Sequence, residues 1–197
     1  MLSITLYEKY EELFFKLKAI IGISQERVIN DVPDDLFSNN VNFFVKSYLI
    51  NVCTYLEAYL QDVAFDHANK INNRVKSACV PYNFLYWKVS KEVKEKDLKF
   101  SDAEFNIVKK EISEDISGNP YKTIKLFRLL GVDLSIEKQF QYNKDLVNSV
   151  VVKRNNIIHH NDSANDISFT DILSYIDVVL VYMKSIEQAL ANQSETT

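Results

Sequence analysis

The chain has 197 residues, which is enough to bury a sizeable hydrophobic core in one domain without disulfides. It contains only three glycines and three prolines, and this scarcity argues against a turn-rich β architecture and favours long helices. The net charge of −4 excludes a protein that is cationic as a whole, so any nucleic acid would have to be held by a local patch.

The first two expected helices have apolar residues at helical spacing. In the first, over about residues 3–21, they recur every three or four positions, at Leu6, Tyr10, Leu13, Leu17 and Ile20, with Tyr7, Phe14 and Ile21 beside them. Gly22 is expected to end this helix. The second helix is expected to begin near Ser38 or Asn39 and to run to about residue 75, before Pro81. Its wide apolar face indicates contacts on two sides, as in the core of a bundle.

Residues 81–138 have a different composition and predict short helices between the two halves of the core. Ser101-Asp-Ala-Glu104 has the spacing of a capping box, which predicts a short helix from there to about Gly118. Asn119-Pro120 predicts an N-cap and a proline in the first turn of another helix, which Gly131 is expected to close.

The start of this insert is rich in aromatic residues and lysines. We expect Phe84, Tyr86 and Trp87 to lie in the core rather than to stack on nucleic-acid bases. The lysines alternate with acidic residues, which is more typical of a solvated face than of an RNA track. They are Lys88, Lys91, Lys94, Lys96 and Lys99.

Two further helices are expected near the C-terminus. One covers about residues 136–160, and the other covers about 168–191, where apolar residues keep a seven-residue repeat. Ser168-Phe-Thr-Asp171 resembles a capping box and predicts the start of the last helix.

Four long amphipathic helices around a shared core predict an all-α four-helix bundle with a short-helical insert between helices 2 and 3. We expect a single domain over residues 1–197. Its core is expected at about 3–75 and 136–191, and its helical insert at about 81–135.

Cysteine usage and the lengths of apolar runs indicate the compartment. Cys53 and Cys79 lack metal-ligand spacing, and their apolar neighbours predict small core residues of a reduced protein. The N-terminal segment has an acidic residue by position 8 and does not resemble a signal peptide, and no uncharged apolar run reaches the roughly 18 residues of a membrane span. We therefore expect a cytoplasmic protein with no membrane partner.

Arg154 is the residue that departs most from its surroundings. It continues an apolar row of the helix expected at 136–160, and a charge that faces a core requires a partner. His159 and His160 follow within six residues, directly before a polar loop at 161–166. An Arg-x4-6-His spacing arises by chance in roughly one such chain in five, so the spacing alone is weak evidence for a functional motif. The stronger evidence is that this motif lies at the end of an apolar helix.

The segment Val151–Asn161, with sequence VVKRNNIIHHN, resembles the signature of the HEPN superfamily. It is most similar to the RiboL-PSP type, in which the motif is close to RNxIAHG. Upstream, the segment Tyr55–Leu60, YLEAYL, resembles the helix with a Leu-Glu pair in those variants. The resemblance covers about residues 40–75 and 140–190 and does not reach the insert. Where the family often has glycine after the histidine, this chain has His160.

This resemblance implies a metal-independent endoribonuclease, used as a toxin or an antiviral effector, that acts on RNA as a homodimer. It implies no cofactor, two catalytic residues per protomer, Arg154 and His159, and an antitoxin or regulatory protein as a further partner. Asn155 is expected to orient the His159 ring, Glu57 to hold the Arg154 side chain, and His160 is the other histidine that would act. Because many family members have lost activity, the alternative is an inactive HEPN-like dimer that binds nucleotide, RNA or protein.

The residue types suit RNA cleavage, because RNA carries its own nucleophile, the 2′-hydroxyl. The reaction then needs a group that titrates near neutrality and a cation for the phosphate charge, which histidine and arginine supply. On one ideal helix, Arg154 and His159 would point ~140° apart. Either the helix ends before His159, or the partner subunit completes the site. His159, His160 and Asp162 are not expected to bind a metal, because the adjacent ring vectors diverge.

Structural roles are the alternative for each of these residues. Arg154 would then be an ion-paired core residue with Glu57 or Asp177 as its partner. His159 would be the C-terminal cap of its helix, favoured by the helix dipole. His67 is expected to be an ordinary helix residue.

Overall fold

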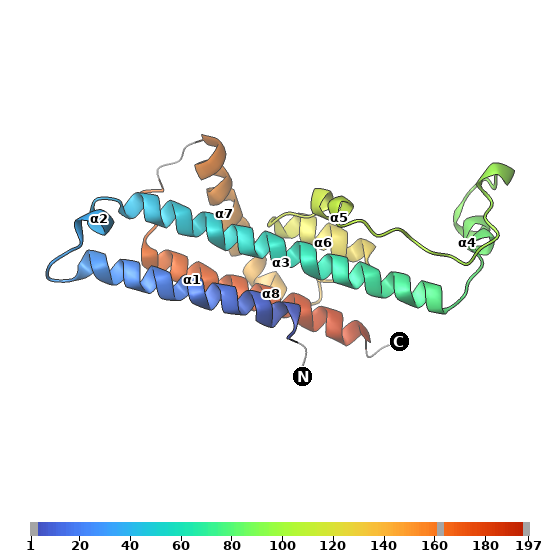
Figure 1. Cartoon of the computed structure of the whole chain (residues 1–197), viewed down its shortest axis with the longest axis horizontal. Coiled ribbons are helices and arrows are strands. Elements are labelled where there is room, and N and C mark those ends of the chain that lie inside the picture. Colours follow the sequence, from blue (N-terminus) through green and yellow to red (C-terminus); the bar gives the residue numbers. More distant parts are fainter. Residues whose placement is uncertain (1–3, 161–163, 195–197) are drawn as a thin grey trace.

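The computed structural model describes residues 4–160 and 164–194, and in this part of the chain all regular secondary structure is helical. Four long helices form the bundle: α1 (Leu6–Ile29), α3 (Val41–Ser77), α7 (Lys138–His160) and α8 (Phe169–Ser194). α8 packs against α1, α3 and α7, and α3 packs against α1 and α7 (Figure 1). The predicted all-α four-helix bundle is confirmed.

α1 begins at a capping box and ends later than expected. The Thr5 hydroxyl accepts a hydrogen bond from the Glu8 N–H at 3.1 Å, and the Glu8 carboxylate accepts one from the Thr5 N–H at 2.7 Å. The expectation that Gly22 ends the helix is wrong, because α1 continues to Ile29. Ile21 and Ser24 on either side of this glycine are buried in the bundle. Their packing offsets the ~1 kcal/mol that a glycine costs inside a helix.

The core of the bundle is built from large aromatic and aliphatic side chains. The Tyr59 hydroxyl donates to the Met183 carbonyl oxygen at 3.0 Å, which ties α3 to α8. The rings of Phe140 on α7 and Tyr182 on α8 stack with their centroids 4.7 Å apart.

The chain between α1 and α3 forms the short helix α2 (Asp35–Ser38). The expected second helix is therefore confirmed as α3, although it begins two or three residues later.

The insert consists of α4 (Tyr82–Val89), the 3₁₀ helix η1 (Glu95–Asp97), α5 (Lys109–Asp115) and α6 (Pro120–Leu129). α5 packs against α3, and α6 packs against α7, so this half of the insert covers the bundle. α4 lies beyond the C-terminal end of α3 (Figure 1). We call residues 78–108, which contain α4 and η1, the arm.

The helix that the Ser101–Glu104 capping box predicted does not form. The Ser101 carbonyl accepts a hydrogen bond from the Tyr82 N–H at 3.0 Å, and the Ala103 N–H donates to the Val80 carbonyl at 2.7 Å. These backbone groups pair the two sides of the arm in an isolated antiparallel bridge, so they are not available to a helix. The next helix, α5, begins only at Lys109.

The other predicted helix ends are confirmed. The Asn119 side chain accepts hydrogen bonds from the Tyr121 and Lys122 N–H groups, and Pro120 is the first residue of α6. Gly131 follows the end of α6 with φ of 81°, a left-handed conformation that favours glycine. The Ser168 hydroxyl accepts from the Asp171 N–H at 3.2 Å at the start of α8.

Two expectations about the arm are wrong. Phe84 and Trp87 are exposed and Tyr86 is half-buried, because α4 contains no buried residue and its aromatic rings do not reach the bundle core. Cys79 is exposed at the start of the arm, whereas Cys53 on α3 is fully buried as expected. Among the described residues, no helix is long and apolar enough to cross a membrane.

Candidate functional site

Arg154 and Glu57 meet between α7 and α3. The Arg154 Nη2 donates to the Glu57 Oε1 at 2.5 Å, and their side chains are 15% and 28% exposed. The expectation that Glu57 holds Arg154 therefore matches a contact in the structure. The other structural partner considered for Arg154, Asp177, instead pairs with Lys18 at 2.6 Å.

The loop between α5 and α6 closes over this ion pair. The Gly118 N–H donates to the same Glu57 Oε1 at 3.2 Å, so this oxygen accepts from both a guanidinium and a backbone amide. A Cβ at Gly118 would lie 3.0 Å from Val151 Cγ2, which is tighter than most such contacts and would require the valine side chain to shift. The absence of a side chain thus allows the loop to approach. Sequence reasoning treated Gly118 only as a helix end, and no local pattern identifies a glycine that approaches a residue 61 positions away.

The side chain of Arg154 is largely shielded from solvent. Its Nε is buried and has no hydrogen-bond partner among the residues that the structure describes. Cys53 lies one turn before Glu57 on α3, where burial raises the pKa of its thiol to about 11 and the positive charge of Arg154 offsets this rise only in part. Because Glu57 and Cys53 engage only part of the five N–H donors of Arg154, the guanidinium retains donors for an anion.

His159 and His160 lie at the C-terminal end of α7, beyond Arg154. α7 continues through both residues, so the helix does not end before His159 as one expectation required. Both histidines are exposed in the last turn, whereas Arg154 points toward α3. Because α7 is a continuous helix, Arg154 and His159 project ~140° apart, and one protomer does not bring them together.

Asn155 was expected to orient the His159 ring, and no hydrogen bond among the described residues supports this role. Asn155 is half-buried on α7 one turn before His159, and no hydrogen bond joins the two within the described part of the chain. Asp162 lies outside the described residues. Among the described ones, no three His, Cys, Asp or Glu side chains are placed to hold a metal ion.

His67 on α3 is remote from Arg154 and is buried. Its Nε2 has no hydrogen-bond partner among the described residues. Burial lowers the pKa of the imidazole, and the nearby positive charges of Arg74 and Lys70 lower it further, against the opposing effects of the Leu130 backbone and Asp66. Its surroundings suit a neutral structural residue.

No curated protein and no solved structure matches the chain. A family model does match it, that of RiboL-PSP-HEPN, over residues 6–192. The match includes the insert, which the motif resemblance did not reach. With the helical bundle and the Arg154 motif on α7, this match shows that the chain belongs to the RiboL-PSP-HEPN family, a HEPN family of ribonucleases.

Proposed function

We propose that the protein is a metal-independent endoribonuclease whose active site is formed by Arg154 and His159 of two protomers. The observation that carries this proposal is that Arg154 is ion-paired and mostly buried. Its guanidinium is paired with Glu57 and largely shielded from solvent, on the same helix that presents His159 to solvent. A permanent cation fixed in this way is suited to stabilise the charge that develops on a phosphate in the transition state.

A two-fold axis resolves the divergence of the two side chains. A second copy of α7, placed antiparallel across the axis, would bring its own histidine toward the first protomer's arginine and create one cleft with two of each. The surface of α7 supports this arrangement, because Val152 and Ile158 near His159 are exposed apolar side chains that a second copy would cover.

The proposed reaction is an attack of the RNA 2′-hydroxyl oxygen on the adjacent phosphorus. One imidazole takes the 2′-hydroxyl proton as the new P–O bond forms, and the bond from phosphorus to the 5′ oxygen breaks. The second imidazole, in its protonated form, gives a proton to the departing 5′ oxygen. The products are a 2′,3′-cyclic phosphate and a 5′-hydroxyl. Arg154 donates to the phosphate oxygens throughout.

We propose a cellular role as a toxin or antiviral effector, held in check by an antitoxin or regulatory protein. Membership in this family supports that role. If it is correct, expression of the wild-type chain in bacteria arrests growth and fragments RNA, whereas expression of His159→Ala does neither.

A second candidate is an inactive HEPN-like dimer that binds RNA, nucleotide or protein. The low exposure of Arg154 favours it, because a guanidinium that is 15% exposed and ion-paired has little surface for a substrate. In that case the protein would bind a ligand in an Arg154-dependent way and would not cleave RNA.

The test is cleavage of a single-stranded RNA by the purified full-length protein in excess EDTA. We expect fragments that end in 2′,3′-cyclic phosphates, and a loss of about 10²–10⁴-fold in rate for His159→Ala. His160→Ala is the matched control, because it removes the neighbouring exposed imidazole and should leave most of the activity. Cleavage that depends on a metal, or equal activity of His159→Ala, would overturn the proposal. Intact RNA with Arg154-dependent binding would favour the second candidate.

A further inference from the structure

The arm presents aromatic rings to solvent without using them to stabilise the bundle. Trp87 is 58% exposed and Phe100 is 96% exposed, and Phe84 lies beside Trp87 with its ring centroid 6.2 Å away. Large apolar rings that gather on one projecting segment indicate a binding surface. Their exposure leaves ring surface on which a planar ligand could stack.

Lysines accompany these rings. The segment 82–100 carries five lysines against three acidic residues, in a chain whose net charge is −4. The Lys88 ammonium lies 3.7 Å from the Trp87 ring centroid, and that of Lys99 lies 4.9 Å from the Tyr82 centroid. Within the described residues, none of the five lysines forms an ion pair with a carboxylate.

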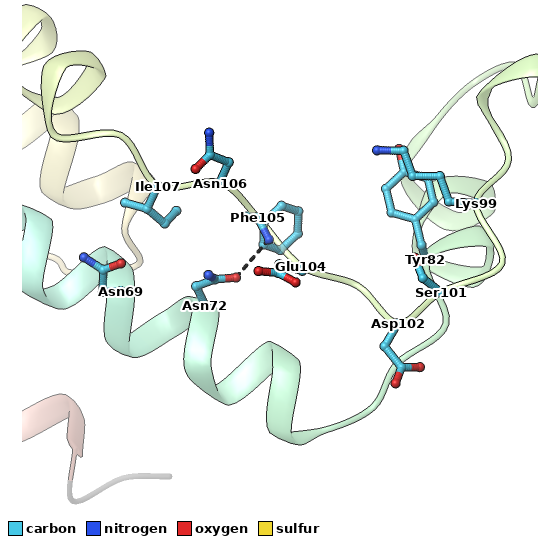
Figure 2. A pocket seen from close by; sticks show the side chains of 10 residues that line it. All are labelled: Asn69, Asn72, Tyr82, Lys99, Ser101, Asp102, Glu104, Phe105, Asn106 and Ile107. Atoms are coloured by element: carbon cyan, nitrogen blue, oxygen red, sulfur yellow. Dashed lines mark hydrogen bonds between the residues drawn. The ribbon is translucent and has the colours of Figure 1, made fainter.

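A hollow of roughly 590 Å³ lies between the arm and the end of α3. Figure 2 shows Tyr82 and Lys99 on its arm side and Asn69 and Asn72 on its α3 side. The Asn72 Oδ1 accepts a hydrogen bond from the Phe105 N–H at 2.9 Å, which holds the returning chain of the arm against α3.

The lining of this hollow includes the carboxylates of Asp102 and Glu104, so it suits an uncharged nucleobase rather than a phosphate. The Phe105 ring is half-exposed and supplies an apolar face, and side-chain amides supply both hydrogen-bond donors and acceptors for a base edge. Asn106 also lines the hollow and is exposed. Lys99 adds a cation at the rim, next to the Tyr82 ring.

We propose that the arm binds single-stranded RNA, with bases stacked on its exposed rings, one base in the hollow, and phosphates at its lysines. Residues 82–100 have a net positive charge that suits an anionic strand, although Asp102 and Glu104 make the arm as a whole neutral. Single strands expose the base faces that a duplex hides. The inference deepens the proposed nuclease function and rests on it for the identity of the ligand as substrate. Glu57 and Ser77 are 20 residues apart on α3, so the arm lies ~30 Å from Arg154. RNA held by the arm would therefore be cleaved several nucleotides away from its anchored segment.

Trp87 allows a direct test because it is the only tryptophan in the chain. Tryptophan emission of the full-length His159→Ala protein, which should not cleave, is titrated with an unstructured single-stranded 12-nucleotide RNA at low salt in EDTA. We expect saturable quenching, because a stacked base quenches indole fluorescence. The affinity should fall as salt increases, with a log–log slope that decreases by about 0.7 for each of Lys88→Gln and Lys99→Gln.

For variants that lack Trp87, binding is measured from the fluorescence anisotropy of the same RNA labelled with a fluorophore. Trp87→Ala and Phe84→Ala are expected to weaken binding by about ten-fold or more each. Phe43→Ala is the matched control, because Phe43 is an exposed phenylalanine at the opposite end of α3. Lys16→Gln on α1 is the control for the loss of one positive charge, and both controls should bind as the parent does.

The outcomes separate this inference from the nuclease proposal. Quenching and arm-dependent binding in a protein whose wild-type form cleaves no RNA would support the arm and refute the nuclease. Normal cleavage by wild type with no quenching, or with arm variants that bind and cleave like the parent, would overturn the arm and leave the nuclease intact. If Trp87→Ala converts a dimer into monomers on gel filtration without changing RNA affinity, the arm is a subunit contact and the inference is wrong.

Discussion

The bundle and the arm place the same types of side chain in opposite environments. In the bundle, the aromatic rings of Phe14, Tyr59, Phe140 and Tyr182 are fully buried. In the arm, Phe84, Trp87 and Phe100 are exposed, and α4 has no buried residue. The two regions also differ in how their charges are used. Arg154 in the bundle is paired with Glu57, whereas the arm lysines have no acidic partner among the described residues.

This contrast indicates a division of labour. Burial of aromatic surface stabilises the bundle, and the bundle in turn fixes the position of Arg154 and of the helix that carries His159. The arm contributes little to that stability, so its rings and lysines are free to bind a ligand. Variants in the two regions should therefore differ in what they change.

One cysteine lies in each region, and the largest expected difference between the regions is in how fast these two thiols react. Cys53 is buried and burial raises the pKa of its thiol to about 11, whereas Cys79 is exposed. At pH 8, we expect Cys79 to react with a thiol reagent at once and Cys53 to react more slowly by at least about a thousand-fold, since it needs the bundle to open. Absorbance during reaction with Ellman's reagent measures both rates, and Cys79→Ser removes the fast phase. Two fast thiols would show that the bundle is not packed as described.

Two phenylalanines provide the matched comparison of stability. Phe140→Ala removes a buried ring that stacks on Tyr182, and we expect a loss of about 3–5 kcal/mol in the free energy of unfolding. Phe100→Ala removes an exposed ring and should change stability by no more than about 0.5 kcal/mol. Urea unfolding followed by circular dichroism measures both. Similar losses for the two variants would contradict the division between bundle and arm.

The Arg154–Glu57 pair should have a smaller effect on stability. Arg154→Ala leaves Glu57 with the Gly118 N–H, and the partial exposure of the carboxylate limits its cost, so we expect a loss of about 1–3 kcal/mol. In a Glu57→Gln background the same change should cost less, because the unpaired charge is gone. Thermal unfolding of the four proteins in this cycle measures the coupling. A loss of about 3–5 kcal/mol with undiminished RNA cleavage would instead make Arg154 a structural residue.

The smallest effect is the pH dependence that His67 contributes, since it involves one group. The pKa of this buried imidazole is lowered in the folded state, so the unfolded chain binds its proton more readily. The contribution is therefore fully present above the ordinary histidine pKa of about 6.5 and is lost as the pH falls below it. We expect His67→Gln to flatten the stability profile between about pH 7 and 5, relative to wild type. A profile unchanged by that substitution would show that the pKa of His67 is the same in the folded and unfolded states.

The bundle was predictable because its helices bury one face each. Spacing of apolar residues located α3, α7 and α8 to within a few residues, and the caps at Asn119 and Ser168 were correct because their hydrogen bonds are local. α1 was cut short at Gly22, since local propensity favoured a stop that tertiary packing overrides. The arm was mispredicted for the opposite reason. Its Ser101 capping box lost its backbone groups to a bridge with residues 80–82, which no short-range pattern reveals.

The candidate site was predictable in part. A lone arginine on an apolar row required a partner, and the motif resemblance directed attention to Glu57, which is its partner in the structure. The approach of Gly118 was missed because it depends on the position of the insert on the bundle. The catalytic roles of Arg154 and His159 stay predictions, because their convergence requires a second protomer that one chain does not contain.

The composite site is the central claim, and the most direct test is dilution of wild-type protomers with His159→Ala protomers. Mixed dimers are formed by co-expression or subunit exchange at increasing proportions of the variant, and RNA cleavage in EDTA is measured at constant total protein. If each site needs histidines from both protomers, a 1:1 mixture retains about one quarter of the wild-type activity, because only wild-type homodimers act. Retention of about one half would show that each protomer acts alone and would contradict the account.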